Sequence, residues 1–237
     1  SGLFDSRCES EAVVRTLRSI AGAETRVTCT KILDRDWVVD SQRAVQPFEV
    51  TKNLWICPNW STPPSDNAKI IWITPGLAFG TGHHPSTALC LEKLVTLDLR
   101  KTIVLDWGCG SGILSIVAVA LGADRAIAVD IAPHALTASH NHAQINDLDD
   151  RLTICRPEEL PDGVKYQLIV ANLLASSLIR LANTFGRYLG NGGKLLLSGV
   201  LEDQVNKVIS TFGTRYSFES AFRDGWAMIT AHCKQDS

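Results

Sequence analysis

The sequence lacks a long hydrophobic run, a secretory leader and a basic excess. No apolar stretch among its 237 residues approaches the roughly 18 that a membrane span requires. The first ten residues show no basic segment followed by an apolar one, so no signal peptide is predicted. The formal net charge of −2 does not provide the positive charge that binding to nucleic-acid phosphates requires. We therefore expect a cytoplasmic protein that binds neither membranes nor nucleic acid directly.

Paired cysteine motifs and zinc-type histidine spacings are also absent. The seven cysteines are an odd number with no CxxC spacing, which is typical of reduced thiols rather than of a disulfide framework or a zinc ribbon. His83-His84 and His140-Asn141-His142 lack the i, i+4 spacing and the third ligand of a zinc site. Capping or solvated contacts are the usual role of such histidines. We predict no metal.

What the sequence does contain is an alternation of strand-like and helix-like segments from residue 103 onward. The strand-like runs are IVLD, AIAVD, RLTIC, QLIVAN and GKLLLSGV, and apolar helical segments separate them. Two further runs, near 215–220 and 226–233, predict a terminal hairpin. Such alternation is typical of a doubly wound α/β fold, with a parallel sheet and crossover helices on both faces. Upstream, we expect a helix over 10–23, a strand over 25–33 and one short strand over 54–57.

A glycine-rich turn, Asp106-Trp107-Gly108-Cys109-Gly110-Ser111-Gly112, follows the first of these strands and opens a helix. Glycines at Gly108, Gly110 and Gly112 would let a ligand approach the backbone closely. Asp130 ends the next strand, eighteen residues after the turn. A carboxylate in that place can accept both hydroxyl groups of a ribose. The pattern therefore predicts a site for a nucleoside-containing cofactor.

Asp106 decides which cofactor we expect. Its carboxylate would repel a pyrophosphate lying on the turn, because like charges a few ångströms apart repel strongly in a partly desolvated site. It would attract an ammonium or a sulfonium group. S-adenosyl-L-methionine carries both cations, a ribose diol and no phosphate, and the glycine spacing is GxGxG rather than GxGxxG. We therefore favour this cofactor over NAD, with a turn used only for helix packing as the remaining alternative.

Two further features lie near the expected cofactor site. Asn172 closes the strand over 168–171, where its amide oxygen could orient an incoming amine, or its side chain could cap the following helix. The segment PGLAFGTGHHPST at 75–87 contains three glycines and could form a loop that closes over the cofactor. Ser86 or Thr87 is expected to begin the helix that follows it. The sequence leaves both roles of Asn172 open.

Several segments together resemble the bacterial PrmA-type methyltransferases of ribosomal protein L11. They are DW at 36–37, LWICPNW, PGLAFGTGHHPST, LDWGCGSGILSI, AVDIAPHALTASHNHAQIN, VANLLASSL and GGKLLLSGVLEDQ, and they cover nearly the whole chain. The resemblance implies a seven-stranded class I (Rossmann-like) methyltransferase fold and S-adenosyl-L-methionine as the methyl donor. It implies lysine side chains and an N-terminal amine of ribosomal protein L11 as acceptors. Carried over by position, the implied donor-binding residues are Thr87, Gly108, Asp130 and Asn172.

The sequence departs from the family pattern at three places. His83 stands where the family commonly has threonine, and Ser41 replaces the second tryptophan of the family's DWxxxW. The resemblance also implies that only the last helix and strand of an α+β recognition domain are present, as a small, incomplete N-terminal segment. We accordingly expect a recognition remnant at 1–40, a linker at 41–66 and a catalytic domain at 67–237.

An amine acceptor must lose a proton before it attacks a methyl group. No residue stands out as the base, and His83, His84 and water are the candidate proton acceptors. Two other functions remain open: a class I methyltransferase acting on another protein or a small molecule, and a non-catalytic protein that only binds the donor. We predict Asn172 as the catalytic residue. The predicted donor-binding residues are Thr87, Asp106, Gly108, Gly110, Gly112, Asp130 and Asn172.

Overall fold

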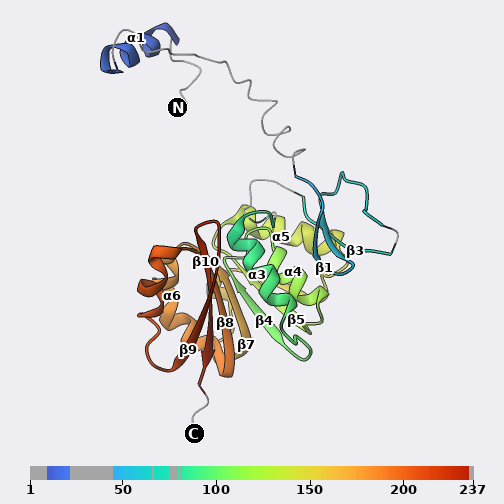
Figure 1. Cartoon of the computed structure of the whole chain (residues 1–237). Coiled ribbons are helices and arrows are strands. Elements are labelled where there is room, and N and C mark those ends of the chain that lie inside the picture. Colours follow the sequence, from blue (N-terminus) through green and yellow to red (C-terminus); the bar gives the residue numbers. More distant parts are fainter. Residues whose placement is uncertain (1–9, 22–44, 66, 75–79, 81, 235–237) are drawn as a thin grey trace. The chain divides into compact units, whose positions relative to one another are not determined.

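The computed structural model describes residues 10–21, 45–65, 67–74, 80 and 82–234 (Figure 1). The chain divides into two compact units, residues 1–44 and 45–237. In the first unit, helix α1 spans Ser10–Ala21, which confirms the helix expected over 10–23. The strand expected over 25–33 lies outside the described residues. The expected domain boundaries at 40 and 66 stay predictions.

A seven-stranded sheet forms the centre of the second unit, in the order β6-β5-β4-β7-β8-β10-β9. Neighbouring strands from β6 to β8 are parallel, and β10 is antiparallel to both β8 and β9. The arrangement confirms the expected α/β fold with its terminal hairpin. The strands are β4 (Ile103–Trp107), β5 (Arg125–Val129), β6 (Leu152–Cys155), β7 (Tyr166–Asn172), β8 (Leu189–Leu201), β9 (Tyr216–Arg223) and β10 (Trp226–Cys233).

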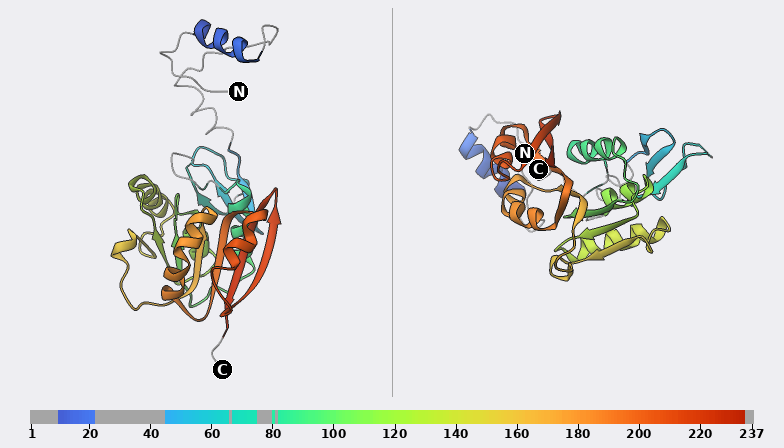
Figure 2. Two further views of the ribbon diagram at one scale, coloured as in Figure 1. Left: turned by 90° about the vertical axis from the view of Figure 1, so that its left-hand side faces the viewer. Right: turned by 90° about the horizontal axis from the view of Figure 1, so that it is seen from below.

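Helices cover both faces of this sheet (Figures 1 and 2). Val104 packs with α3 and α4, whereas the next residue, Leu105, packs with α6 and α7. Because side chains alternate along a strand, both faces of β4 are buried in apolar layers. The helices are α3 (Pro85–Val95), α4 (Ile113–Ala120), α5 (Pro133–Ile145), α6 (Ala175–Tyr188) and α7 (Val205–Ile209), with short 3-10 turns η1 (Pro157–Glu159) and η2 (Glu202–Gln204). No helix in the described part of the chain is long and apolar enough to cross a bilayer.

A second, small sheet contains β1 (Phe48–Thr51), β2 (Leu54–Cys57) and β3 (Lys69–Trp72) in that order. The sequence predicted only the strand over 54–57. Leu54, Ile56 and Ile71 belong to the same apolar cluster as α3 and α4, so this sheet packs on the main body. On the side of β3 away from β2, the side-chain amide of Asn146 pairs with the backbone of Trp72. Its Oδ1 accepts from Trp72 N at 2.8 Å and its Nδ2 donates to Trp72 O at 2.8 Å.

The strand order reverses between β4 and β7. From β4 the chain proceeds outward to β5 and β6, and it then returns to place β7 on the other side of β4. Loops that leave neighbouring strands in opposite directions open a crevice at the carboxyl ends of those strands. The glycine-rich turn follows β4 and Asn172 ends β7. Both sequence features therefore lie at this crevice.

Candidate active site

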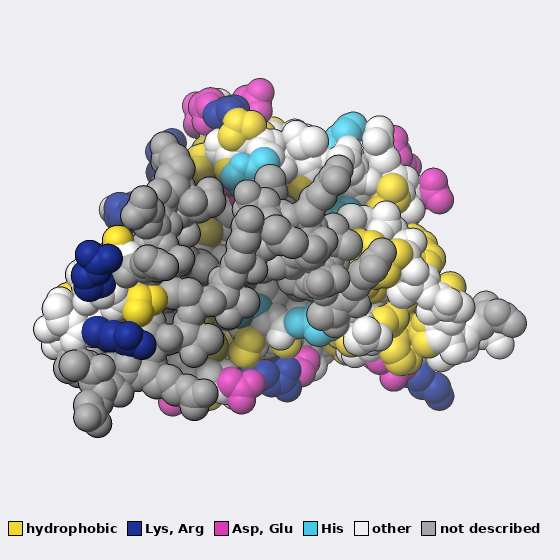
Figure 3. All heavy atoms as spheres, turned by 90° about the horizontal axis from the view of Figure 1, so that it is seen from above, with side chains coloured by type: hydrophobic (Ala, Val, Ile, Leu, Met, Phe, Trp, Pro, Cys, Tyr) yellow, Lys and Arg dark blue, Asp and Glu magenta, His cyan; other side chains and the backbone are white. Residues whose placement is uncertain are grey.

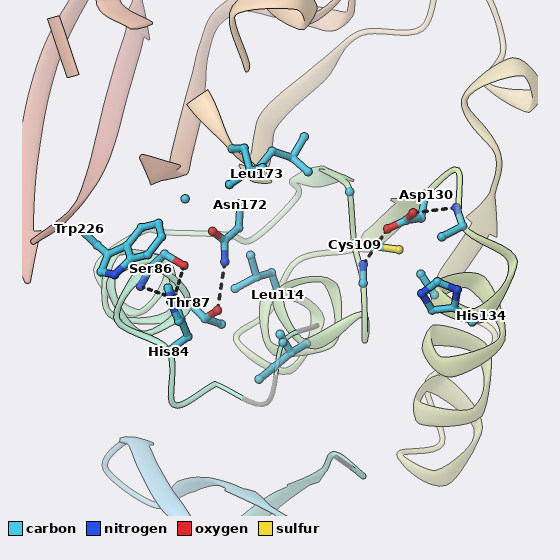
Figure 4. Close-up of a pocket in the computed structure, with 18 residues that line it drawn as sticks. His84, Ser86, Thr87, Cys109, Leu114, Asp130, His134, Asn172, Leu173 and Trp226 are labelled. Atoms are coloured by element: carbon cyan, nitrogen blue, oxygen red, sulfur yellow. Dashed lines mark hydrogen bonds between the residues drawn. The ribbon is translucent and has the colours of Figure 1, made fainter. Parts of the chain in front are cut away.

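A cavity of about 380 Å³ opens at the carboxyl ends of β4, β5 and β7. Its size lies within the usual range for small-molecule sites. Five of the predicted donor residues line it, namely Thr87, Gly108, Gly110, Asp130 and Asn172. Figure 3 shows the molecule from above, with histidine side chains visible among apolar and acidic ones on the described surface. Figure 4 shows that the cavity has two ends, one at Asp130 and one at Trp226.

The glycine-rich turn forms the floor between these two ends. The N–H groups of Gly108 and Cys109 donate to Val129 O at 2.7 and 3.0 Å, so the turn folds back over the end of β5. Gly108 has a φ of +77°, and a Cβ there would collide with the side chain of Leu173. Glycine therefore suits the left-handed backbone and lets the Leu173 side chain lie close to the turn.

Asp130 is held with its carboxylate toward the cavity. Its Oδ2 accepts from Gly110 N at 3.0 Å and its Oδ1 accepts from Ala132 N at 2.9 Å. Each carboxylate oxygen can accept more than one hydrogen bond. Because Asp130 also lines the cavity, each oxygen has acceptor capacity for a ligand. Two hydroxyl groups on adjacent carbons, as in a ribose, match two such acceptors.

Asp106 lies beneath the turn rather than at the cavity. Its side chain is only 1% exposed, and Oδ2 accepts from Ser115 N at 3.1 Å and Ser115 Oγ at 2.7 Å. Burial raises the pKa of Asp106 to about 6, although the bonds from Ser115 oppose this shift. The carboxylate ties β4 to α4 and is not among the cavity-lining residues. Its predicted contact with the donor stays a prediction.

Gly112 also lies away from the cavity lining. It precedes the first residue of α4 with a φ of +78°, and a Cβ there would lie 2.9 Å from the Oγ of Ser139 in α5. Its lack of a side chain lets α5 approach the turn. Gly112 thus has a packing role, and its predicted contact with the donor stays a prediction.

Asn172 lies at the other end of the cavity from Asp130. Its Nδ2 donates to Thr87 Oγ1 at 3.0 Å, which leaves the amide oxygen pointing toward the Trp226 side (Figure 4). Helix α6 begins at Ala175, with Leu174 at the N-cap and no side-chain cap. The helix-capping interpretation of Asn172 is therefore wrong.

Thr87 is held by the first turn of α3, which the sheet anchors. Its side chain is 1% exposed. The hydroxyl of Ser198 in β8 donates to Ser86 O at 3.0 Å and is also bonded to Ala227 O in β10. The start of α3 is thus tied to two strands. The Thr87 hydroxyl therefore has a fixed place from which to orient Asn172.

Sequence reasoning missed Trp226, which reaches the cavity from the start of β10. Its ring centroid lies 4.6 Å from that of His84, at an interplanar angle of 72°. His84 also lines the cavity, and its Nδ1 accepts from Ser86 N at 3.3 Å at the start of α3. His83, in contrast, is not among the lining residues and packs edge-on against Phe48 at 4.7 Å. Of the two candidate proton acceptors, only His84 is placed at the site.

His134 also lines the cavity and was missed. A signal was present, because it follows Asp130 by four residues in the first turn of α5. Among the described residues, no three His, Cys, Asp or Glu side chains form a group that could hold a metal ion. The expectation of no metal stays a prediction. Within the segment 75–87, where a loop was expected, residues 75–79 and 81 lie outside the described residues, whereas Gly80, which lines the cavity, and Gly82 are described.

Comparison with known proteins gives one consistent result. A family model described as ribosomal protein L11 methyltransferase (PrmA) matches residues 1–234. A ribosomal protein L11 methyltransferase of Shewanella amazonensis is 41% identical over 231 residues, which cover 96% of this chain and 78% of that protein. The protein of the same name from Haemophilus influenzae (strain PittEE) is 40% identical over 235 residues, covering 98% and 80%.

Solved structures agree with this result. The crystal structure of a ribosomal protein L11 methylase from Lactobacillus delbrueckii subsp. bulgaricus superposes with a TM-score of 0.73 at 27% identity, covering 81% of this chain and 100% of that one. An RNA methyltransferase from Salinibacter ruber, in complex with S-adenosyl-L-homocysteine, gives a TM-score of 0.51 at 16% identity, covering 63% and 92%. The second likeness shows a common fold alone.

Proposed function

The chain belongs to the ribosomal protein L11 methyltransferase (PrmA) family, and from this premise we propose that it transfers methyl groups from S-adenosyl-L-methionine to lysine side-chain and N-terminal amines of ribosomal protein L11. The observation that carries the proposal is the two-ended cavity, with Asp130 at one end and the Asn172 amide oxygen at the other (Figure 4). All residues that line it lie between 80 and 226, within the part 67–237 proposed as catalytic. A ribosomal protein as substrate supports the cytoplasm as the compartment.

The cavity's chemistry fits S-adenosyl-L-methionine, which supplies a methyl group bound to a positively charged sulfur. Asp130 is proposed to accept the two ribose hydroxyls, since each of its oxygens holds one backbone N–H and has further capacity. Gly108 and Gly110 let the ligand lie against the backbone. No lysine or arginine is among the described residues that line the cavity, and such side chains commonly bind phosphates. Membership of a methyltransferase family is what distinguishes S-adenosyl-L-methionine from NAD here.

The opposite end is proposed to receive the acceptor amine. Because Asn172 Nδ2 is bonded to Thr87, its Oδ1 is the atom that can accept a hydrogen bond from the amine and direct the nitrogen lone pair. Leu173, Leu174 and Trp226 give this end an apolar lining. Burial of an amine among apolar groups disfavours the ammonium form and lowers its pKa. This apolar lining therefore favours the neutral amine, which is the form that can attack the methyl group.

These placements give each residue a proposed role. Asn172 is the catalytic residue, and Thr87 positions it. Asp130, Gly108 and Gly110 bind the donor. His84 lines the cavity beside Trp226, at the end proposed to receive the amine, and is proposed to take the proton that the amine releases, whereas His134 lies in the helix that follows Asp130.

The proposal is tested by transfer of labelled methyl groups into purified ribosomal protein L11. We expect incorporation at amines with the wild-type chain and a strong loss of turnover with Asn172→Ala, whose affinity for S-adenosyl-L-methionine should stay near that of the wild type. Donor binding without transfer to any acceptor would instead indicate a non-catalytic donor-binding protein. Labelling of other components of a lysate, but not of L11, would indicate a different acceptor.

A further inference from the structure

One face of α5 connects the glycine-rich turn to β3. Ser139 Oγ donates to Gly110 O at 3.0 Å, and His142 Nδ1 lies 2.7 Å from Ser111 O. Asn146, at the end of the helix, pairs with the backbone of Trp72. These three residues recur at intervals of three and four positions, so they share one side of the helix. The helix therefore holds the floor of the donor site and the small sheet at the same time.

The two ring nitrogens of His142 have different partners. The side chain is 4% exposed, and its Nε2 accepts from Thr74 N at 3.0 Å. Its Nδ1 faces the carbonyl oxygen of Ser111, which can only accept. The proton must therefore sit on Nδ1, and the imidazole is neutral. Burial lowers the pKa of His142, and the hydrogen bond to the Ser111 carbonyl opposes this shift.

Ser111 is joined to the chain on both sides of residues 75–79. Through His142 it is linked to Thr74, and its own Oγ donates to Gly80 O at 2.5 Å. The residue before it, Gly110, lines the cavity and donates its N–H to Asp130. A shift of the Ser111 carbonyl would therefore move both the floor of the donor site and the acid proposed to bind the ribose.

We propose that His142 is a positioning residue for the methyl-donor site, which as the neutral Nδ1–H form holds Ser111, and with it Gly110 and Asp130, in the arrangement that binds the donor. The inference rests on the proposed function, because the donor is S-adenosyl-L-methionine. Protonation would place an Nε2–H directly against the N–H of Thr74, so the two donors would repel and displace the ring from Ser111, whereas an uncharged side chain that ends short of Thr74 causes no such repulsion. Donor binding then weakens when His142 is protonated.

Two substitutions separate the two bonds of His142. Asparagine places its amide near the position of Nδ1, so His142→Asn keeps a donor for Ser111 O and loses the bond to Thr74. Glutamine reaches the position of Nε2, so His142→Gln keeps an acceptor for Thr74 and loses the bond to Ser111. Neither side chain titrates. Both variants lose one buried hydrogen bond, so a merely structural role predicts the same outcome for the two.

The measurement is calorimetric titration with S-adenosyl-L-methionine at pH 7.5, beside the melting temperature of each variant. We expect a Kd for His142→Gln about three- to tenfold above the wild-type value, from the loss of one hydrogen bond that fixes the turn. His142→Asn should stay within about twofold of the wild type, although both variants melt at similarly lowered temperatures. Equal donor affinities of the two variants would overturn the proposal.

A pH series provides a second test, which does not need His142→Gln to fold. Several titratable side chains occur on the elements around His142, namely Lys69, Asp106, Cys109, Asp130, His134, His140 and Cys155. They are the same in the wild type and in His142→Asn, so the difference between the two profiles isolates residue 142. Because burial lowers the pKa of His142 below its ordinary value, the series must extend from pH 7.5 down to about 4.5. The wild type should lose affinity relative to His142→Asn as His142 is protonated, and parallel profiles over this whole range would overturn the proposal. A wild-type chain that binds no donor at any pH would instead refute the proposed function itself.

Discussion

The amide nitrogen of Asn172 at the end of β7 donates to the hydroxyl of Thr87 in the first turn of α3, at 3.0 Å. The two residues are 85 positions apart in the sequence, and their contact fixes which end of the amide faces the cavity. An amide whose nitrogen is engaged presents its oxygen, which is the atom that an incoming amine needs. Thr87 thereby fixes the orientation of the Asn172 amide.

Thr87→Val tests this control. Valine has nearly the same shape but cannot accept from Asn172 Nδ2, so the amide is free to rotate. We expect kcat to fall about three- to tenfold, the effect of one hydrogen bond that no longer orients the amide, with little change in the Kd of S-adenosyl-L-methionine. Thr87→Ser keeps the hydroxyl and should restore most of the rate. Steady-state kinetics of the two variants decide the matter, and equal kcat values would contradict the assigned role.

Asp130→Asn should weaken donor binding. The amide nitrogen of asparagine must face the N–H of either Gly110 or Ala132, and the charge-assisted bonds to the ribose, each contributing about 1.5–3 kcal/mol, are reduced. We expect the donor Kd to rise by about tenfold or more in calorimetric titration. Asp124→Asn, at an exposed acid away from the cavity lining, is the matched control and should bind normally. An unchanged Kd for Asp130→Asn would refute its assignment to the ribose.

Asp106→Asn should change how stability depends on pH. Burial raises the pKa of Asp106 from 3.8 to about 6 in the folded chain, so the folded state favours the protonated form. The stabilising contribution is complete below the unfolded pKa and is lost as the pH rises through about 6. Asparagine stays neutral and can still accept from Ser115. Its free energy of unfolding relative to the wild type should therefore be higher at pH 7.5 than at pH 4.5.

A raised pKa of this size corresponds to a difference on the order of 2–3 kcal/mol between the two pH values. Urea unfolding of both chains at the two pH values measures it directly. If the free energies of unfolding of the variant and the wild type differ by the same amount at pH 4.5 and at pH 7.5, burial does not destabilise the Asp106 carboxylate. The donor Kd should change far less than for Asp130→Asn, because Asp106 does not line the cavity.

Gly108→Ala should harm both folding and donor binding. The position has a φ of +77°, and the added Cβ would collide with the side chain of Leu173. Gly163→Ala is a matched control, because its φ is +78° but nothing lies within 4 Å of the added Cβ. In both variants, a Cβ in the left-handed backbone conformation should lower the free energy of unfolding by about 1–2 kcal/mol. In urea unfolding, Gly108→Ala should lose substantially more free energy of unfolding than Gly163→Ala, and only Gly108→Ala should weaken donor binding. Equal losses of stability in the two variants would show that the Leu173 side chain can move aside without destabilising the fold.

The parts of the site that the sequence predicted are those that depend on neighbours along the chain. A strand followed by a glycine turn, or a strand that ends in an acid, places its functional group at a known edge of a parallel sheet. Gly108, Gly110 and Asp130 accordingly line the cavity. The same reasoning located Asn172 at the end of its strand, and family resemblance added Thr87.

What the sequence could not predict depends on side-chain direction and on distant elements. Asp106 belongs to the same short motif as the glycines, but its strand position turns it beneath the turn toward Ser115. Trp226 reaches the cavity only because β10 lies beside β8 in the sheet, a pairing that no local pattern indicates. β1 and β3 are four residues long and each contains a charged residue, whereas the equally short β2 is apolar throughout and was predicted.

The pairing of Asn146 with Trp72 has a consequence for the behaviour of the protein at high concentration. An uncovered strand edge offers backbone donors and acceptors to any extended chain and invites intermolecular association. A primary amide presents one donor and one acceptor side by side, as a peptide group does, and Asn146 applies both to the outer edge of β3. Asn146 thus occupies the N–H and C=O of Trp72, so at this position on the edge of β3 neither group is left for an extended chain to pair with.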